Sequence, residues 1–78
     1  MNIIFHRQAV KDLERLDVPT KQRIKQDIEG IPNGDIVPLQ GCPGLYRLRV
    51  GNWRIVFSYP EAETVLIEKI TPRGSAYK

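Results

Sequence analysis

The spacing of apolar residues changes partway along the chain. Within residues 7–31, apolar side chains recur three or four positions apart, the spacing of an amphipathic helix. These positions are Ala9 or Val10, Leu13, Leu16, Ile24, Ile28 and Ile31. From Leu45 onward, apolar residues alternate with polar ones, the period of a half-buried strand. The pattern therefore predicts helices followed by a sheet rich in hairpins.

Capping residues indicate the limits of the N-terminal elements. Asn2–Phe5 is rich in β-branched and aromatic residues and predicts a short buried strand. A first helix is expected over residues 7–16, and either Asp17 or Thr20 can cap a second one. The second helix should end at Gly30, and the two helices are expected to form an antiparallel pair.

The C-terminal half predicts three strands after an irregular segment. Residues 35–44 contain two prolines and two glycines and are expected to form a loop. The strands expected after it are Leu45–Val50, Trp53–Tyr59 and Thr64–Ile70. The order β-α-α-β-β-β predicts a single α+β domain over residues 1–78, with two N-terminal helices packed on a small, largely antiparallel sheet.

Gly51 and Asn52 fit a two-residue hairpin turn in which glycine supplies a positive φ. Residues directly opposite each other then have numbers that sum to 103. One side of this hairpin is apolar and is expected to face the core: Tyr46, Leu48, Val50, Trp53, Ile55 and Phe57. The other side carries Arg47, Arg49 and Arg54, which we call the arginine face.

The arginine face places Arg49 directly opposite Arg54. Like charges across a sheet are destabilising by up to about 1 kcal/mol, and a domain of this size has little stability to spare. A bridging anion would offset the repulsion, and the planar guanidinium groups suit phosphate. Alternatively, the arginines lie apart in solvent or pair with Asp35, Glu61 or the C-terminus.

The charge distribution also favours an anionic partner. The net charge is +3, and residues 1–44 carry six bases and six acids, so the whole excess lies in residues 45–78. A merely solubilising surface is the alternative interpretation.

Lys69, Thr71 and Arg73 alternate along and beyond the last strand and are expected to extend the arginine face. The register of that strand stays open, because Val65-Ile67-Lys69 and Leu66-Glu68-Ile70 both form plausible inward sets. Tyr77 either stacks on a nucleobase beside the basic residues or is a frayed chain end.

Several other classes of protein are excluded. With 78 residues, 41% hydrophobic and 27% charged, the chain is neither a disordered tail nor a coiled coil. Its longest apolar runs have three residues, so no segment spans a membrane, and the N-terminus lacks a signal pattern, so a cytoplasmic protein is expected. The single cysteine, Cys42, excludes an internal disulfide.

The remaining candidates for chemistry favour structural roles. His6 stands where a strand meets a helix and is expected to cap or pack. Cys42 lies in a Gly-Cys-Pro-Gly turn, and Trp53 is expected in the core. No phosphate-binding glycine loop, metal-ligand spacing or Ser-His-Asp set is present, so no metal or cofactor is expected.

The segment Leu45–Phe57 resembles the central hairpin of RelE/ParE-type toxins of bacterial type II toxin–antitoxin systems. The spacing of apolar residues over residues 5–16 resembles that family's first strand and helix. Leu39-Gln40-Gly41 resembles the loop before the hairpin, and Ile70–Tyr77 resembles the C-terminal segment, basic and then tyrosine. The resemblance covers essentially the whole chain and is closest to the RelE-like branch.

This resemblance implies a microbial RNase-like fold and a ribosome-dependent mRNA endonuclease that acts in the ribosomal A site. There the 2′-hydroxyl of the mRNA attacks the adjacent phosphate, leaving a 2′,3′-cyclic phosphate and a 5′-hydroxyl. The implied partners are a cognate antitoxin, mRNA and the 70S ribosome, with no membrane and no small-molecule cofactor. The residues implied as catalytic are Arg47, Arg49, Arg54, Arg73 and Tyr77, and those expected to bind RNA are Lys69 and Lys78.

Two departures from the family pattern bear on the mechanism. Some members carry lysines where this chain has Arg47 and Arg49, and arginine cannot act as a base near neutral pH. Others use a Glu or His as the base, and the sequence does not assign that role to Asp35. The resemblance therefore leaves three functions open: an mRNA endonuclease, a ParE-like inhibitor of DNA gyrase, and an inactive RNA-binding member.

Overall fold

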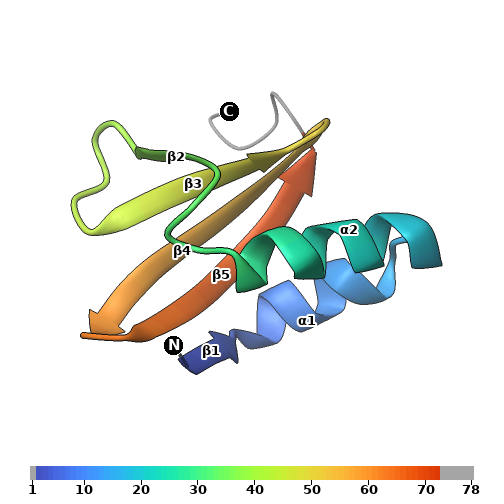
Figure 1. The fold of residues 1–78 in the computed structure, drawn as a ribbon, viewed down its shortest axis with the longest axis horizontal. Coiled ribbons are helices and arrows are strands. Elements are labelled where there is room, and N and C mark those ends of the chain that lie inside the picture. The colour runs from blue at the N-terminus through green and yellow to red at the C-terminus, as the bar shows by residue number, and fades with distance from the viewer. Residues whose placement is uncertain (1, 73–78) are drawn as a thin grey trace.

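The computed structural model describes residues 2–72, which form two helices and one five-stranded sheet (Figure 1). In chain order the elements are β1 (Asn2–Phe5), α1 (Arg7–Glu14), α2 (Val18–Glu29), β2 (Asp35–Pro38), β3 (Leu45–Val50), β4 (Trp53–Glu61) and β5 (Thr64–Pro72). The strand order is β1-β5-β4-β3-β2, with β1 parallel to β5 and every other pair antiparallel. The α+β class predicted from the sequence is confirmed.

Side-chain caps begin both helices. His6 Nδ1 accepts a 3.0 Å hydrogen bond from the Gln8 amide, so His6 has the capping role expected of it. Asp17 accepts hydrogen bonds from the hydroxyl and the amide of Thr20, at 2.8 and 3.3 Å. These bonds satisfy donors that the first turn of a helix leaves without partners. They also hold the pKa of Asp17 below its ordinary value of 3.8.

The helices run in opposite directions beside a strongly twisted sheet (Figure 1). Contacts join α1 mainly to β5 and α2 to β3. The core lies between the helices and the sheet and consists of Ala9, Leu13, Ile24, Ile28, Ile31, Leu48, Val50, Ile55, Phe57, Val65, Ile67 and Ile70. Within residues 2–72, no helix is long and apolar enough to cross a membrane.

The strand β2 corrects the expectation of a loop over residues 35–44. Asp35–Pro38 pairs with β3, and the loop is confined to the residues between them. Its composition hid the strand, because aspartate and proline are rare inside sheets. Pro38 is tolerated there because it ends an edge strand, where no neighbouring strand needs its missing N–H.

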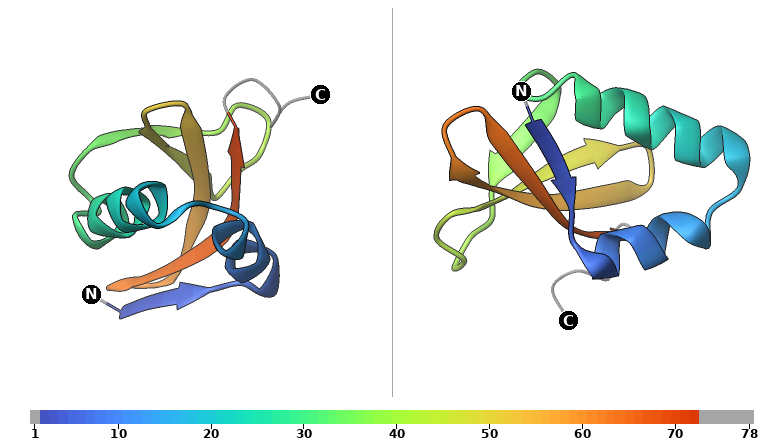
Figure 2. Two further views of the ribbon diagram at one scale, coloured as in Figure 1. Left: turned by 90° about the vertical axis from the view of Figure 1, so that its right-hand side faces the viewer. Right: turned by 90° about the horizontal axis from the view of Figure 1, so that it is seen from below.

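The N-terminal strand is also placed differently from the expectation of a buried strand. β1 lies at the opposite edge of the sheet beside β5 (Figure 2) and is only half-buried, with Ile4 52% exposed. Its apolar composition reflects one buried face, to which Ile3 and Phe5 contribute. Four residues are too few for their alternation to stand out from a continuous apolar run.

A bulge in β5 resolves the open register of the last strand. Phe57 pairs with Ile67 whereas Val56 pairs with Lys69, so one extra residue, Glu68, is accommodated between them. Val65 and Ile67 are buried before the bulge and Ile70 after it. Each of the two predicted inward sets is therefore correct for part of the strand.

Candidate nucleic-acid interface

The β3–β4 hairpin has the register predicted from its two-residue turn. Cα partners run from Val50 with Trp53 to Tyr46 with Phe57, and they include Arg49 opposite Arg54. Gly51 has a φ of 58°, as the first central residue of a type II′ turn requires. Because side chains alternate along a strand, the arginine face lies on the side of the sheet away from the core.

The neighbouring strands extend the arginine face on both sides. On β5, Lys69 pairs with Val56, and Thr71 pairs with Arg54. On β2, Asp35 pairs with Arg49. Lys69 and Thr71 therefore lie where the sequence pattern placed them, whereas Asp35 enters the face through a strand that the sequence analysis did not predict.

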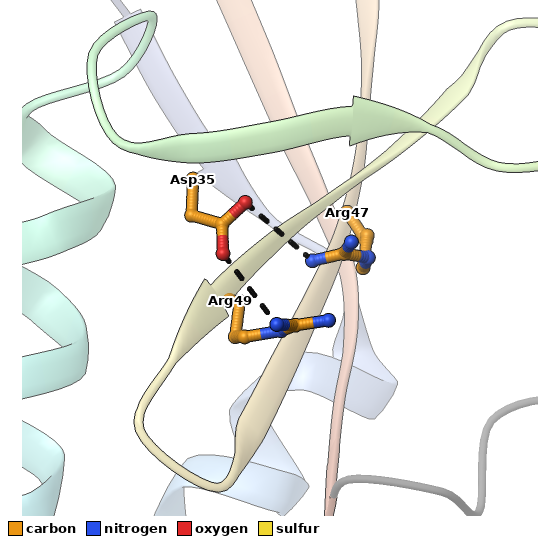
Figure 3. A network of polar contacts seen from close by, with 3 residues as sticks. All are labelled: Asp35, Arg47 and Arg49. Carbon is orange, nitrogen blue, oxygen red and sulfur yellow. Dashed lines mark ion pairs between the residues drawn. The ribbon is translucent and has the colours of Figure 1, made fainter.

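Asp35 forms ion pairs with two arginines of the face. Its Oδ1 lies 3.9 Å from Arg47 Nη1, and its Oδ2 lies 3.8 Å from Arg49 Nε. Figure 3 shows the carboxylate facing both guanidinium groups from one side, with one oxygen toward each. The Asp35 pairing considered in the sequence analysis therefore exists, but both distances exceed the roughly 2.7–3.2 Å of a hydrogen bond.

Several polar atoms at this face are buried without a hydrogen-bond partner in the described part of the chain. They include Arg47 Nη1, Arg49 Nε and Thr71 Oγ1. Buried donors of this kind are costly to leave unsatisfied, and unpaired ones call for an explanation such as a ligand. An oxyanion is the partner that two guanidinium groups prefer.

Val56 gives the arginine face an apolar floor. It is 1% exposed although it lies on the side of the sheet away from the helices, and the sequence analysis did not single it out. Its cross-strand partners are Arg47 and Lys69, whose methylene stems can cover it. Arg47 is accordingly the more buried of the two paired arginines, at 13% against 39% for Arg49.

An open groove of about 570 Å³ lies at this face, lined by Pro38, Gln40, Arg47 and Arg54. Ligand sites commonly have volumes of roughly 300–1,000 Å³. Pro38 and Gln40 were not predicted as site residues. The one signal that pointed to Gln40 was its place in the segment before the hairpin.

The remaining predicted site residues, Arg73, Tyr77 and Lys78, lie outside the described residues. Within residues 2–72, no group of three or more His, Cys, Asp or Glu side chains is arranged to hold a metal ion. Cys42 is an exposed free thiol in the loop before β3. Its amide donates a hydrogen bond to the Leu39 carbonyl, and its carbonyl accepts one from the Leu45 amide.

Comparisons with known proteins agree with this geometry. Residues 3–77 match the family described as ParE toxin of the type II toxin–antitoxin system parDE. Toxin RelE3 of Methanocaldococcus jannaschii is 32% identical, over 99% of this chain and 96% of its own length.

Two solved complexes have the same fold. The RelE chain of the RelB–RelE antitoxin–toxin complex from Methanococcus jannaschii superposes with a TM-score of 0.77 at 30% identity, covering 95% of this chain and 94% of that one. The archaeal RelE–RelB complex from Pyrococcus horikoshii OT3 gives 0.74 at 26% identity, covering 96% and 97%. The chain therefore belongs to the RelE/ParE family of type II toxin–antitoxin toxins.

Proposed function

We propose that this toxin is a ribosome-dependent mRNA endonuclease that cleaves mRNA in the ribosomal A site. The observation that carries the proposal is the arginine face, where three guanidinium groups lie on adjacent strands beside an open groove. A phosphate that binds there supplies acceptors for the buried donors of Arg47 and Arg49.

The proposed chemistry is attack by the 2′-hydroxyl on its neighbouring phosphate. The O2′–P bond forms, the P–O5′ bond breaks, and the products are a 2′,3′-cyclic phosphate and a 5′-hydroxyl. Arg47, Arg49 and Arg54 stabilise the additional negative charge of the pentacoordinate phosphorus. We assign Arg73 to the leaving group and Tyr77 to positioning of the RNA, with Lys69 and Lys78 contacting its backbone.

Arginine remains protonated near neutral pH, so the arginine face supplies charge stabilisation and does not remove the 2′-hydroxyl proton. That proton goes to Tyr77 in its phenolate form or to ribosomal RNA, and the departing 5′-oxygen takes up a proton from solvent to become the 5′-hydroxyl. We propose that the ribosome presents the message to the phosphate site of the toxin, which is why cleavage is expected to require the ribosome.

We further propose a cognate antitoxin as the protein partner and the cytoplasm as the location. Support for the antitoxin comes from the solved relatives, which are toxins in complex with RelB antitoxins. The antitoxin neutralises the toxin, and no small-molecule cofactor takes part.

A ParE-like inhibitor of DNA gyrase is the second candidate, because the matching family is described by the ParE toxin. Expression in growing cells separates the two. An endonuclease stops growth and leaves truncated messages with 5′-hydroxyl ends, whereas a gyrase inhibitor induces the DNA-damage response with messages intact. Arg54→Ala serves as the matched variant, and growth arrest that it leaves unchanged contradicts the proposed site.

A further inference from the structure

We propose that Asp35 is an internal counter-ion of the arginine face, which competes with the substrate phosphate for Arg47 and Arg49 and thereby limits the affinity for RNA. This inference rests on the proposed function of the same site. It assigns to Asp35 a role that opposes RNA binding, so that removal of its charge is expected to strengthen binding.

The position of Asp35 supports competition. Its two carboxylate oxygens lie 3.9 and 3.8 Å from nitrogens of Arg47 and Arg49, so it lies where a phosphate would need to be to contact both arginines (Figure 3). Both anions prefer the same forked guanidinium donors. A phosphate that binds the pair must therefore share them with the carboxylate or displace it.

The weakness of the two ion pairs supports displacement of the Asp35 carboxylate by a phosphate. Neither ion pair is short enough to be a hydrogen bond, and the two arginine nitrogens are buried without hydrogen-bond partners in residues 2–72. The Asp35 side chain is 53% exposed, so it is free to turn toward solvent. A weakly paired, exposed carboxylate lowers the repulsion between the arginines in the free protein and gives way to a more highly charged anion.

The location of Asp35 on β2 supports a role specific to this site. β2 is the edge strand beside β3, and Asp35 is the cross-strand partner of Arg49. A second carboxylate near the arginine face is that of Glu68 on β5, and it accepts a 3.0 Å hydrogen bond from the Ser58 hydroxyl. Within residues 2–72, Asp35 therefore forms ion pairs with Arg47 and Arg49, whereas the Glu68 carboxylate accepts a hydrogen bond from a hydroxyl.

The test compares Asp35→Asn with Asp27→Asn, a matched control on α2. Asp27 is exposed on the helical side of the sheet, and both changes raise the net charge by one. The probe is a fluorescent 2′-O-methyl RNA oligonucleotide, which cannot be cleaved because its attacking hydroxyl is blocked. Fluorescence anisotropy over a series of salt concentrations gives the Kd and its salt dependence.

The expected result is that Asp35→Asn lowers the Kd about tenfold, and Asp27→Asn less than about twofold, because only Asp35 engages the arginines. The plot of log binding constant against log salt should also steepen by about 0.7 for Asp35→Asn, the increment for one more phosphate contact on a single strand. A merely structural role for Asp35 does not produce this change in slope.

Three outcomes overturn the inference: equal effects of the two variants on the Kd, weaker binding by Asp35→Asn than by wild type, and no binding of the probe by wild type or Asp35→Asn. Thermal melting of each variant identifies a loss of fold, in which case Asp35→Ser replaces Asp35→Asn in the same assay. The proposed endonuclease is judged separately. If binding strengthens as expected and mRNA still stays intact on translating ribosomes, the inference about Asp35 stands and the proposed cleavage fails.

Discussion

Arg49 lies directly opposite Arg54 across the β3–β4 hairpin, on the side of the sheet that faces away from the core. Such a like-charge pair destabilises a sheet unless an anion lies nearby. In the free protein Asp35 provides one such anion for Arg49, and we propose that RNA phosphate provides the other.

The first prediction concerns the arginines themselves. Arg54→Ala is expected to abolish toxicity on expression, and Arg49→Ala to weaken it, because each removes charge stabilisation from the phosphate site. The free energy of unfolding should stay within about 1 kcal/mol of wild type or rise slightly, since a like-charge pair is relieved. Growth curves and urea denaturation measure the two effects.

Arg7→Ala is the matched control for these variants, because Arg7 is exposed in the first turn of α1. It should remain as toxic as wild type. Full toxicity of both Arg54→Ala and Arg49→Ala would show that the arginine face is not the functional site.

The second prediction concerns a hydrogen bond that joins α1 to β5. Asp12 Oδ2 accepts a 2.9 Å bond from the Ile70 amide, beyond the point where β1 stops pairing with β5. Asp12→Ala leaves that amide without its partner and is expected to cost about 1–3 kcal/mol of unfolding free energy. Urea denaturation measures the loss.

Gln8→Ala is the control for this hydrogen bond. The Gln8 side chain donates to the other oxygen of Asp12 at an exposed site, so its removal tests that contact alone. It should cost less than about 0.5 kcal/mol. Equal losses in the two variants would mean that the bond to Ile70 contributes nothing beyond a surface contact.

The third prediction concerns the apolar floor of the arginine face. Val56→Ala removes two methyl groups at a position that is 1% exposed and is expected to destabilise the fold by about 1–3 kcal/mol. Val10→Ala, at a position 43% exposed on α1, should cost well under 1 kcal/mol. If the two variants unfold at the same urea concentration, Val56 is not packed as the structure indicates.

The fourth prediction concerns pH and the cap of α2. The hydrogen bonds from Thr20 lower the pKa of Asp17, so the ionised carboxylate stabilises the folded state. This contribution is fully present above the unfolded pKa, near 3.8, and is lost as the pH falls through the lower pKa of the folded protein. Wild type should therefore melt above Asp17→Ala at pH 7, and the difference should shrink below about pH 3.8. A difference that stays constant down to pH 2 would contradict this role.

The hairpin was predictable because its local signals agree. The Gly51-Asn52 turn and the strict alternation of Leu48 and Ile55 with arginines leave only one register that buries the apolar side, and the structure has that register. The helix caps were predictable in part: the sequence offered Asp17 or Thr20 as the cap of α2 and a capping or packing role for His6, and the structure has Asp17 and His6 as caps.

The strand β2 and the role of Asp35 were not predictable to the same degree, because they depend on tertiary pairing. Asp35 and Pro38 have low strand propensity, and their strand is stabilised by pairing with β3. The bulge at Glu68 is likewise invisible in a pattern of period two, since it shifts the buried set partway along one strand. Both features lie beside the arginine face. The sequence predicted that Arg47, Arg49 and Arg54 share one side of the hairpin, and it offered Asp35 only as one of several partners, without the strand that brings it there.

The most direct test of the proposed function is primer extension on a defined mRNA in a purified translation system, with wild-type protein beside Arg54→Ala. The proposal predicts cuts within codons in the ribosomal A site that require ribosomes and disappear in the variant. An intact message with wild-type protein, or cuts that persist unchanged with Arg54→Ala, would contradict it.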